Sequence, residues 1–253
     1  MGTFVKAHIL PQALTRPGIR GHPYIQAGEA SRPIRRWSSW YDPYLVTEDG
    51  EAILRRYDGW GIRELRKHKL VWNAWGPMVS LATRDYKQNT NQIGTRVVLG
   101  LDNPKLRLFF LSLLWRAAAT ALNEFSSVKL SRRKLGLLRR MLVAGEVGES
   151  TDFPITLVQF STQGTWHNHT PLIGRKKVGD RDVPFFRFYF DGLVAHIHPD
   201  EDDYGDMTVG KSDRLGVLTM PYENSFQDEN LRIGITETNM IWTREIMGLA
   251  NNQ

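Results

Sequence analysis

The chain has 253 residues, of which 41% are hydrophobic and 24% charged, and its formal net charge is +6 at pH 7. These values are ordinary for a folded globular protein, and the positive excess suits a polyanionic partner such as nucleic acid. Cysteine is absent, which excludes disulfides, thiolate zinc sites and a cysteine nucleophile. No signal peptide or membrane-spanning run stands out, so we expect a cytoplasmic protein.

The N-terminal third combines short predicted strands with one helix. Aromatic and β-branched residues favour strands over residues 4–10 and 34–46. Over residues 49–68, apolar residues recur at spacings of three and four, which predicts a helix. Gly59 and Gly61 are expected to bend or split it.

A polar segment without hydrophobic periodicity, residues 86–95, follows this helix. Its composition predicts a loop and the best boundary between domains. We therefore expect an N-terminal domain over residues 1–85 and a second domain over residues 96–253.

The next predicted helix begins with Asn103 as N-cap and Pro104 in its first turn. Apolar residues surround almost its whole circumference, so we expect it to be central and buried. Arg107 and Arg116 interrupt the apolar run, which therefore indicates a core helix rather than a membrane span.

A second central helix is predicted over residues 131–144, with Ser131 in position to cap it. Its apolar residues are expected on one side and its arginines largely on the other. The predicted buried residues are Leu135, Leu138, Met141 and Leu142, and the arginines are Arg132, Arg133, Arg139 and Arg140.

The C-terminal half is predicted to be rich in strands, with Asp191-Gly192 as a hairpin turn. An acidic loop is expected at 199–206 and a helix at 237–249. The whole chain is thus expected to be an α+β fold with a small N-terminal hairpin-plus-helix module, central buried helices and a β-rich C-terminal part. The strands are predicted at residues 153–162, 183–192, 193–199 and 214–223.

The stretch GTWHNHTP, residues 164–171, spells His-Asn-His at its centre. The nuclease motif of that name takes its residues from scattered positions of a hairpin and a helix. Alternate residues of one strand instead point to the same face. The spelling therefore does not indicate that nuclease site.

Paired histidines offer a metal site instead. In extended segments, His167 and His169 share one face, and so do His196 and His198, with Asp200 nearby. Up to four imidazoles could bind zinc, iron or manganese if the two pairs lie on neighbouring strands. The structural alternative is that these histidines form hydrogen bonds within a polar sheet face.

The segment FVKAHILPQAL, residues 4–14, resembles the opening of the HNH and treble-clef nuclease family, in which a short His-Ile-hydrophobic-Pro run ends the first strand. His8 is the matching histidine, with Ile9 and Pro11 in the expected places. PYLVTEDGEAILRRYD, residues 43–58, resembles the stretch where the family enters its helix. The resemblance implies a metal-dependent endonuclease, with His8 as general base and Mg²⁺, Mn²⁺ or Zn²⁺ as cofactor.

Several positions depart from the family pattern. Ala7 stands where many of these nucleases carry a metal-binding acid, and the cysteines that hold a structural zinc are missing. A decayed module, in which His8 is structural, is therefore the alternative. The nearby groups able to hold a metal ion are Asp49, Glu51, Asp58 and His68, with Asp49 and Asp58 as the leading candidates.

From about Arg36 onward the chain also resembles a group of bacterial proteins to which no activity is attached. The similar features are RRWSSWYD, GEAIL, LRKHKLVW, LRLFFLSLLWRAAAT and FRFYFDG. This resemblance is more extensive, but it implies no biochemical function.

Basic residues combine with aromatic residues in RPIRRWSSWYD, which contains Arg35, Arg36 and Trp37. KLSRRKLGLLRR carries six basic residues and no acid, and its arginines are those of the second central helix. Arginine contacts to phosphate and aromatic stacking on bases are typical of nucleic-acid binding. A solvated helix face beside an edge of the core is the simpler interpretation.

The fingerprints of dinucleotide-binding, P-loop, serine-hydrolase and zincin enzymes are missing, so no nucleotide cofactor is expected. The leading hypothesis is a nucleic-acid-binding protein, with DNA favoured over RNA and an HNH-like endonuclease as its enzymatic form. The alternatives are a non-catalytic interaction or scaffold protein with a decayed nuclease module, and a His-ligated metalloenzyme.

Overall fold

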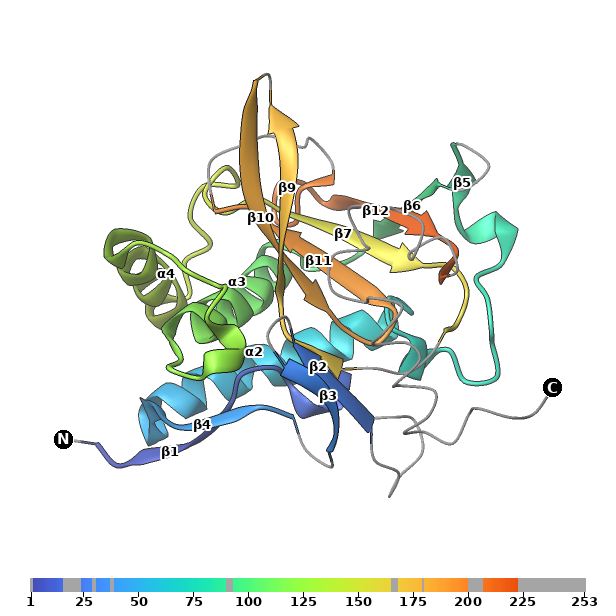
Figure 1. Ribbon diagram of the computed structural model, residues 1–253. Helices are drawn as coiled ribbons and strands as arrows, with labels where there is room; N and C mark the ends of the chain where they lie inside the picture. Colours follow the sequence, from blue (N-terminus) through green and yellow to red (C-terminus); the bar gives the residue numbers. More distant parts are fainter. Residues whose placement is uncertain are drawn as a thin grey trace.

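The computed structural model describes residues 2–15, 24–28, 31–36, 39–89, 93–164, 168–178, 180–199 and 207–222. Helix α3 (Asn103–Ala119) lies against one face of a seven-stranded sheet, and α2 (Glu48–Lys67) and α4 (Arg132–Ala144) pack on α3 (Figure 1). The architecture is α+β, as the sequence predicts. Trp37, His167, Asp200 and the predicted helix at 237–249 lie outside the described residues, as does the acidic loop apart from Pro199.

The N-terminal module is a strand pair followed by a helix. Strand β1 (Phe4–His8) pairs antiparallel with β4 (Tyr41–Thr47), and α2 (Glu48–Lys67) follows at once. Acidic side chains in the first turn of α2 complement the helix dipole. The predicted strand at residues 4–10 and the predicted helix are confirmed, whereas the stretch 34–46, predicted as one strand, contains the end of one strand and most of β4, which belong to different sheets. The elements between β1 and β4 in sequence are α1 (Gln12–Thr15), β2 (Tyr24–Gly28) and β3 (Ser31–Arg36).

Helix α2 runs unbroken through Gly59 and Gly61, so the expected break is wrong. A Cβ atom on Gly61 would lie 2.4 Å from the ring of Phe109 in α3. Glycine at this position therefore allows the two helices to approach closely.

Helix α3 (Asn103–Ala119) is buried on nearly all sides, as predicted. Its N-cap is Asp102 rather than Asn103: the Asp102 carboxylate accepts a hydrogen bond from the Lys105 N–H at 3.1 Å. Asn103 is the first helical residue, and its amide donates to the Ser212 carbonyl. Both residues are good caps, so composition alone did not separate them.

Helix α4 (Arg132–Ala144) matches its predicted range, but Leu135, which was predicted to be buried, is only half-buried. The Ser131 hydroxyl accepts a hydrogen bond from the Lys134 N–H, and Gly145 ends the helix with a φ of 74°. Leu138, Met141 and Leu142 are buried against the core.

The large sheet is antiparallel except between β12 and β7, which run parallel. Asp191-Gly192 forms the predicted turn between β10 and β11, and Gly192 has a φ of 79°. The segment 86–95, which was predicted as a loop, carries β5 and the start of β6. Strand β5 pairs with β6 over only two residues at the edge of the sheet, so it forms without any hydrophobic alternation in the sequence. In spatial order the strands are β5 (Lys87–Gln88), β6 (Gly94–Leu99), β12 (Arg214–Met220), β7 (Ile155–Phe160), β11 (Leu193–Ile197), β10 (Arg181–Tyr189) and β9 (Leu172–Val178).

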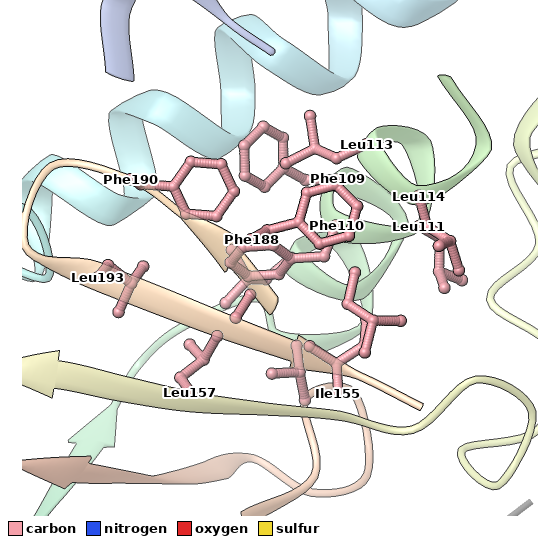
Figure 2. Close-up of a cluster of buried hydrophobic side chains, with 14 of the residues drawn as sticks. Phe109, Phe110, Leu111, Leu113, Leu114, Ile155, Leu157, Phe188, Phe190 and Leu193 are labelled. Atoms are coloured by element: carbon pink, nitrogen blue, oxygen red, sulfur yellow. The ribbon is translucent and has the colours of Figure 1, made fainter. Parts of the chain in front are cut away.

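The main core fills the space between α3 and the sheet (Figure 2). Phe109 and Phe110 of α3 meet Phe188 of β10 and Leu157 of β7, and each such side chain contributes about 1.5–3 kcal/mol by burial. The same cluster includes Ile9 from the N-terminal module, so one core spans the expected domain boundary. The division into two domains stays a prediction.

A second apolar cluster covers part of the opposite sheet face. Trp72, at the start of the short 3-10 helix η1 (Trp72–Ala74), packs there with Phe160 and Val194. Side chains alternate along a strand, so Phe186 and Phe188 of β10 face α3. Arg187 and Tyr189, at the alternate positions, face this second side.

Candidate functional site

His8 closes strand β1 and lies opposite Tyr41 of β4. The two rings meet edge to face with centroids 6.4 Å apart, and Nζ of Lys6 lies 3.6 Å from the centroid of the Tyr41 ring. The His8 carbonyl accepts a hydrogen bond of 3.0 Å from Nη1 of Arg116. Helix α3 thus anchors the backbone of His8, and the residue is half-buried.

Asp58 is paired with Arg116. Nη2 of Arg116 lies 2.6 Å from Oδ1 of Asp58, and Nη1 lies 3.0 Å from Oδ2. This bidentate pair engages both carboxylate oxygens and neutralises the negative charge that would attract a metal ion to Asp58. Arg116 therefore bridges Asp58 and the His8 carbonyl, where the endonuclease hypothesis requires a metal ion.

Glu51 lies within the electrostatic influence of this pair. Burial raises the pKa of its carboxyl, while the positive charges of Arg116 and Arg55 oppose the rise and the negative charge of Asp58 adds to it. The acidic groups on this side of α2 are thus balanced by arginines.

Asp49 and His68 lie at opposite ends of α2. His68 follows the last turn, with Nε2 3.4 Å from Oε2 of Glu64, and burial lowers the pKa of its imidazole. Across the described residues, no group of three or more histidine, aspartate and glutamate side chains is placed to hold a metal ion.

The described histidines of the two predicted pairs do not share a sheet. His196 lies in β11 with His198 directly after it, whereas His169 lies in β8 (Asn168–His169), which pairs with β2. Strands β8 and β11 are therefore not hydrogen-bonded neighbours. Nδ1 of His169 lies 2.8 Å from the Thr170 carbonyl, and its ring packs on Tyr189.

Arg187 of β10 lies opposite His196 in the β10–β11 ladder. Burial, followed by the positive charge of Arg187 and the neighbouring His198, lowers the pKa of His196 to about 3. The rings of His196 and His198 each lie about 5 Å from the ring of Phe185. A fixed positive charge thus lies beside two of the predicted metal ligands, and it disfavours a cation there.

The arginines of α4 form the clearest exposed basic surface. Helix α4 packs beside α3 at the outside of the helical layer (Figure 1). Arg35 and Arg36 lie in β3, paired with Ile25 and Tyr24 of β2. The exposed α4 residues are Arg132, Arg133, Arg139 and Arg140, and Lys129 just before the helix is exposed as well.

A cavity of about 480 Å³ lies between the paired strands β1 and β4 and the helices α2, α3 and α4. Its walls are mainly apolar, with Trp115 on one side and the charged residues Asp49 and Arg139 among its lining. Phe4 and Val143, also in the lining, are 55% and 62% exposed. Sequence patterns did not predict this cavity, because the fold assembles its walls from five separate elements.

No protein-family model, curated protein sequence or solved structure matches this chain. Among the described residues, no helix is long and apolar enough to cross a membrane. Sequence reasoning also missed Arg187, although an arginine between aromatic residues in FFRFYF is a signal of an unusual buried charge.

Proposed function

We propose that the protein binds nucleic acid through the exposed arginine face of α4 and does not cleave it. The observation that carries this proposal is the separation of the two sides of α4: its arginines are exposed, and Leu138, Met141 and Leu142 are buried in the core. Between residues 129 and 145 the chain has six basic residues and no acid. Such a face suits phosphates, which bind arginine by charge and paired hydrogen bonds.

The spacing of the arginines supports a polymeric partner. Arg132 and Arg139 are seven residues apart, which corresponds to about 10 Å along a helix. This length matches the rise of about three base pairs along the axis of double-stranded DNA. DNA is therefore the first partner to test, with single-stranded RNA beside it.

Binding is measured by fluorescence anisotropy over a range of salt concentrations. The test variant replaces the four α4 arginines by glutamine, and the control replaces four exposed basic residues on other elements; both reduce the net charge from +6 to +2. We expect the α4 variant to lose about tenfold or more in affinity and to show a shallower salt dependence, while the control stays near the wild type. Equal losses in both variants would refute the α4 interface. The control residues are Arg84, Lys87, Lys211 and Arg214.

A second candidate is the metal-dependent endonuclease. The antiparallel pair of β1 and β4, with His8 at the end of β1 and α2 directly after β4, supports it. The donor set does not fit a metal ion well, because both oxygens of Asp58 accept hydrogen bonds from Arg116. We therefore derive no reaction step through a metal.

Cleavage is tested with plasmid DNA and single-stranded RNA in Mg²⁺, Mn²⁺ or EDTA. The variant is His8→Ala, and His68→Ala, at the far end of α2, is the control. We expect no metal-dependent cleavage by any of the three proteins. Cleavage that is lost in His8→Ala and kept in His68→Ala would establish the endonuclease instead. If the wild type neither binds nor cleaves nucleic acid, the non-catalytic interaction protein takes its place.

A further inference from the structure

Three arginines, Arg107, Arg116 and Arg187, are buried, with 1%, 1% and 0% of their surface exposed. Burial of a guanidinium is costly unless acceptors satisfy its N–H groups. Arg116 donates through all three of its nitrogens, and a carboxylate balances its charge. Arg107 also uses all three, on the carbonyl oxygens of Val147, Glu149, Asp152 and Phe153.

Arg187 lacks such a set of acceptors. Its Nη2 donates to the Ile173 carbonyl at 3.2 Å. Within the described part of the chain, Nε and Nη1 have no acceptor, and no carboxylate lies within ion-pair distance. The ring of Phe185, 5.7 Å from Cζ, adds a weak cation–π contact. Among the three buried arginines, Arg187 is therefore the one that still requires a negative partner.

His196 provides a second polar group at the same place. It lies opposite Arg187 in the β10–β11 ladder, and its Nε2 is buried with no hydrogen-bond partner among the described residues. Because its pKa is lowered to about 3, its imidazole is neutral at neutral pH. A neutral imidazole that carries its proton on Nε2 donates a hydrogen bond from that atom.

We propose that Arg187 and His196 form a binding site for a small oxyanion, either a carboxylate or a phosphate group, on the sheet face turned away from α3. An oxyanion supplies both the acceptor oxygens and the negative charge that these side chains lack. The ligand, or the end of it that enters, is small because the Arg187 side chain and the Nε2 atom of His196 are both buried. This site does not depend on the arginines of α4, so either proposal can fail alone.

The first test is thermal unfolding of the wild type in sodium chloride, sodium acetate and sodium phosphate at equal ionic strength. A ligand that binds the folded state raises the Tm with its concentration. We expect the Tm to rise in phosphate, in acetate or in both, relative to chloride. A response to phosphate alone identifies a phosphate site, and a response to acetate alone identifies a carboxylate site. No rise in either anion would overturn the proposal, as would stabilisation by Zn²⁺ instead.

The second test replaces Arg187 by methionine, an apolar side chain of similar length. We expect Arg187→Met to be at least as stable as the wild type in chloride, because it removes a buried charge, and to lose the anion response. The exposed control Arg214→Met should keep that response. A marked loss of stability in Arg187→Met, or failure to fold, would overturn the proposal, since it would mean that the arginine is already paired within the chain.

A third variant tests the second ligand directly. His196→Phe keeps an aromatic ring but removes the Nε2 donor, so we expect anion binding to weaken about tenfold or more while Arg187 stays in place. Unchanged anion affinity in this variant would remove His196 from the site.

Discussion

Protonation of Asp191 is expected to control the stability of the fold in mildly acidic solution. The residue lies in the turn between β10 and β11 and is 6% exposed. Its Oδ2 accepts a hydrogen bond of 2.7 Å from the Asn73 N–H, and among the described residues Oδ1 has no partner. Burial raises the pKa of this carboxyl from 3.8 to about 7, although the Asn73 hydrogen bond and the charge of Arg66 act in the opposite direction.

The size and sign of the effect follow from this difference in pKa. A rise from 3.8 to about 7 corresponds to about 4 kcal/mol as an upper value. Because the folded-state pKa lies above the unfolded value, the contribution to stability is fully present below pH 3.8 and is lost as the pH rises through about 7. The free energy of unfolding should therefore decrease by up to about 4 kcal/mol between pH 3.8 and about pH 7. A salt-bridged carboxylate has the opposite effect, because its folded-state pKa lies below the unfolded value.

Urea unfolding of the wild type and Asp191→Asn, from about pH 4 to about pH 8 at constant ionic strength, measures this effect. Asparagine resembles the protonated acid in shape and keeps an acceptor for the Asn73 N–H. We expect the free energy of unfolding of the wild type, minus that of the variant, to decrease as the pH rises. Asp213→Asn, at an exposed position, controls for the change in net charge. A difference that stays flat or increases with pH would refute the reasoning.

Two further predictions concern the helical layer, and urea unfolding checks both. Gly61→Ala should destabilise by about 1–3 kcal/mol, because its Cβ would overlap the ring of Phe109. Gly59→Ala on the same helix, where the nearest atom lies 3.8 Å away, should instead stabilise by up to about 1 kcal/mol, and equal effects would contradict the proposed close approach. Asp58→Ala should cost about 3–5 kcal/mol by leaving Arg116 buried without its carboxylate; an unchanged stability would mean that the pair contributes little.

Local signals predicted most of the elements. Ser131 and the apolar spacing after it predicted α4, and Asp191-Gly192 predicted the β10–β11 turn, because a cap or a turn depends on residues close in sequence. The surroundings of Arg187 could not be predicted in this way. They depend on the register of β10 against β9 and β11, which pairs residues far apart in sequence.

The same limit applies to the candidate site of the N-terminal module. His8 and Asp58 could be selected by residue type, but the partner that joins them comes from α3, about a hundred residues after His8. In the sequence, Arg116 was visible only as an interruption of an apolar run. In the fold, the same arginine neutralises a predicted metal ligand, so the two parts of the chain must be considered together.

The exposed arginines of α4 are well suited to a functional test because the helix does not need them for its attachment. Leu138, Met141 and Leu142 bury its inner side, and the Tyr57 hydroxyl of α2 donates to the Leu142 carbonyl at 2.7 Å. Lys134 differs, since its Nζ donates to the Pro199 carbonyl, and it is therefore left unchanged in the binding variant. Loss of binding after replacement of the four arginines would thus report on the surface itself rather than on unfolding, and an unchanged Tm would verify this.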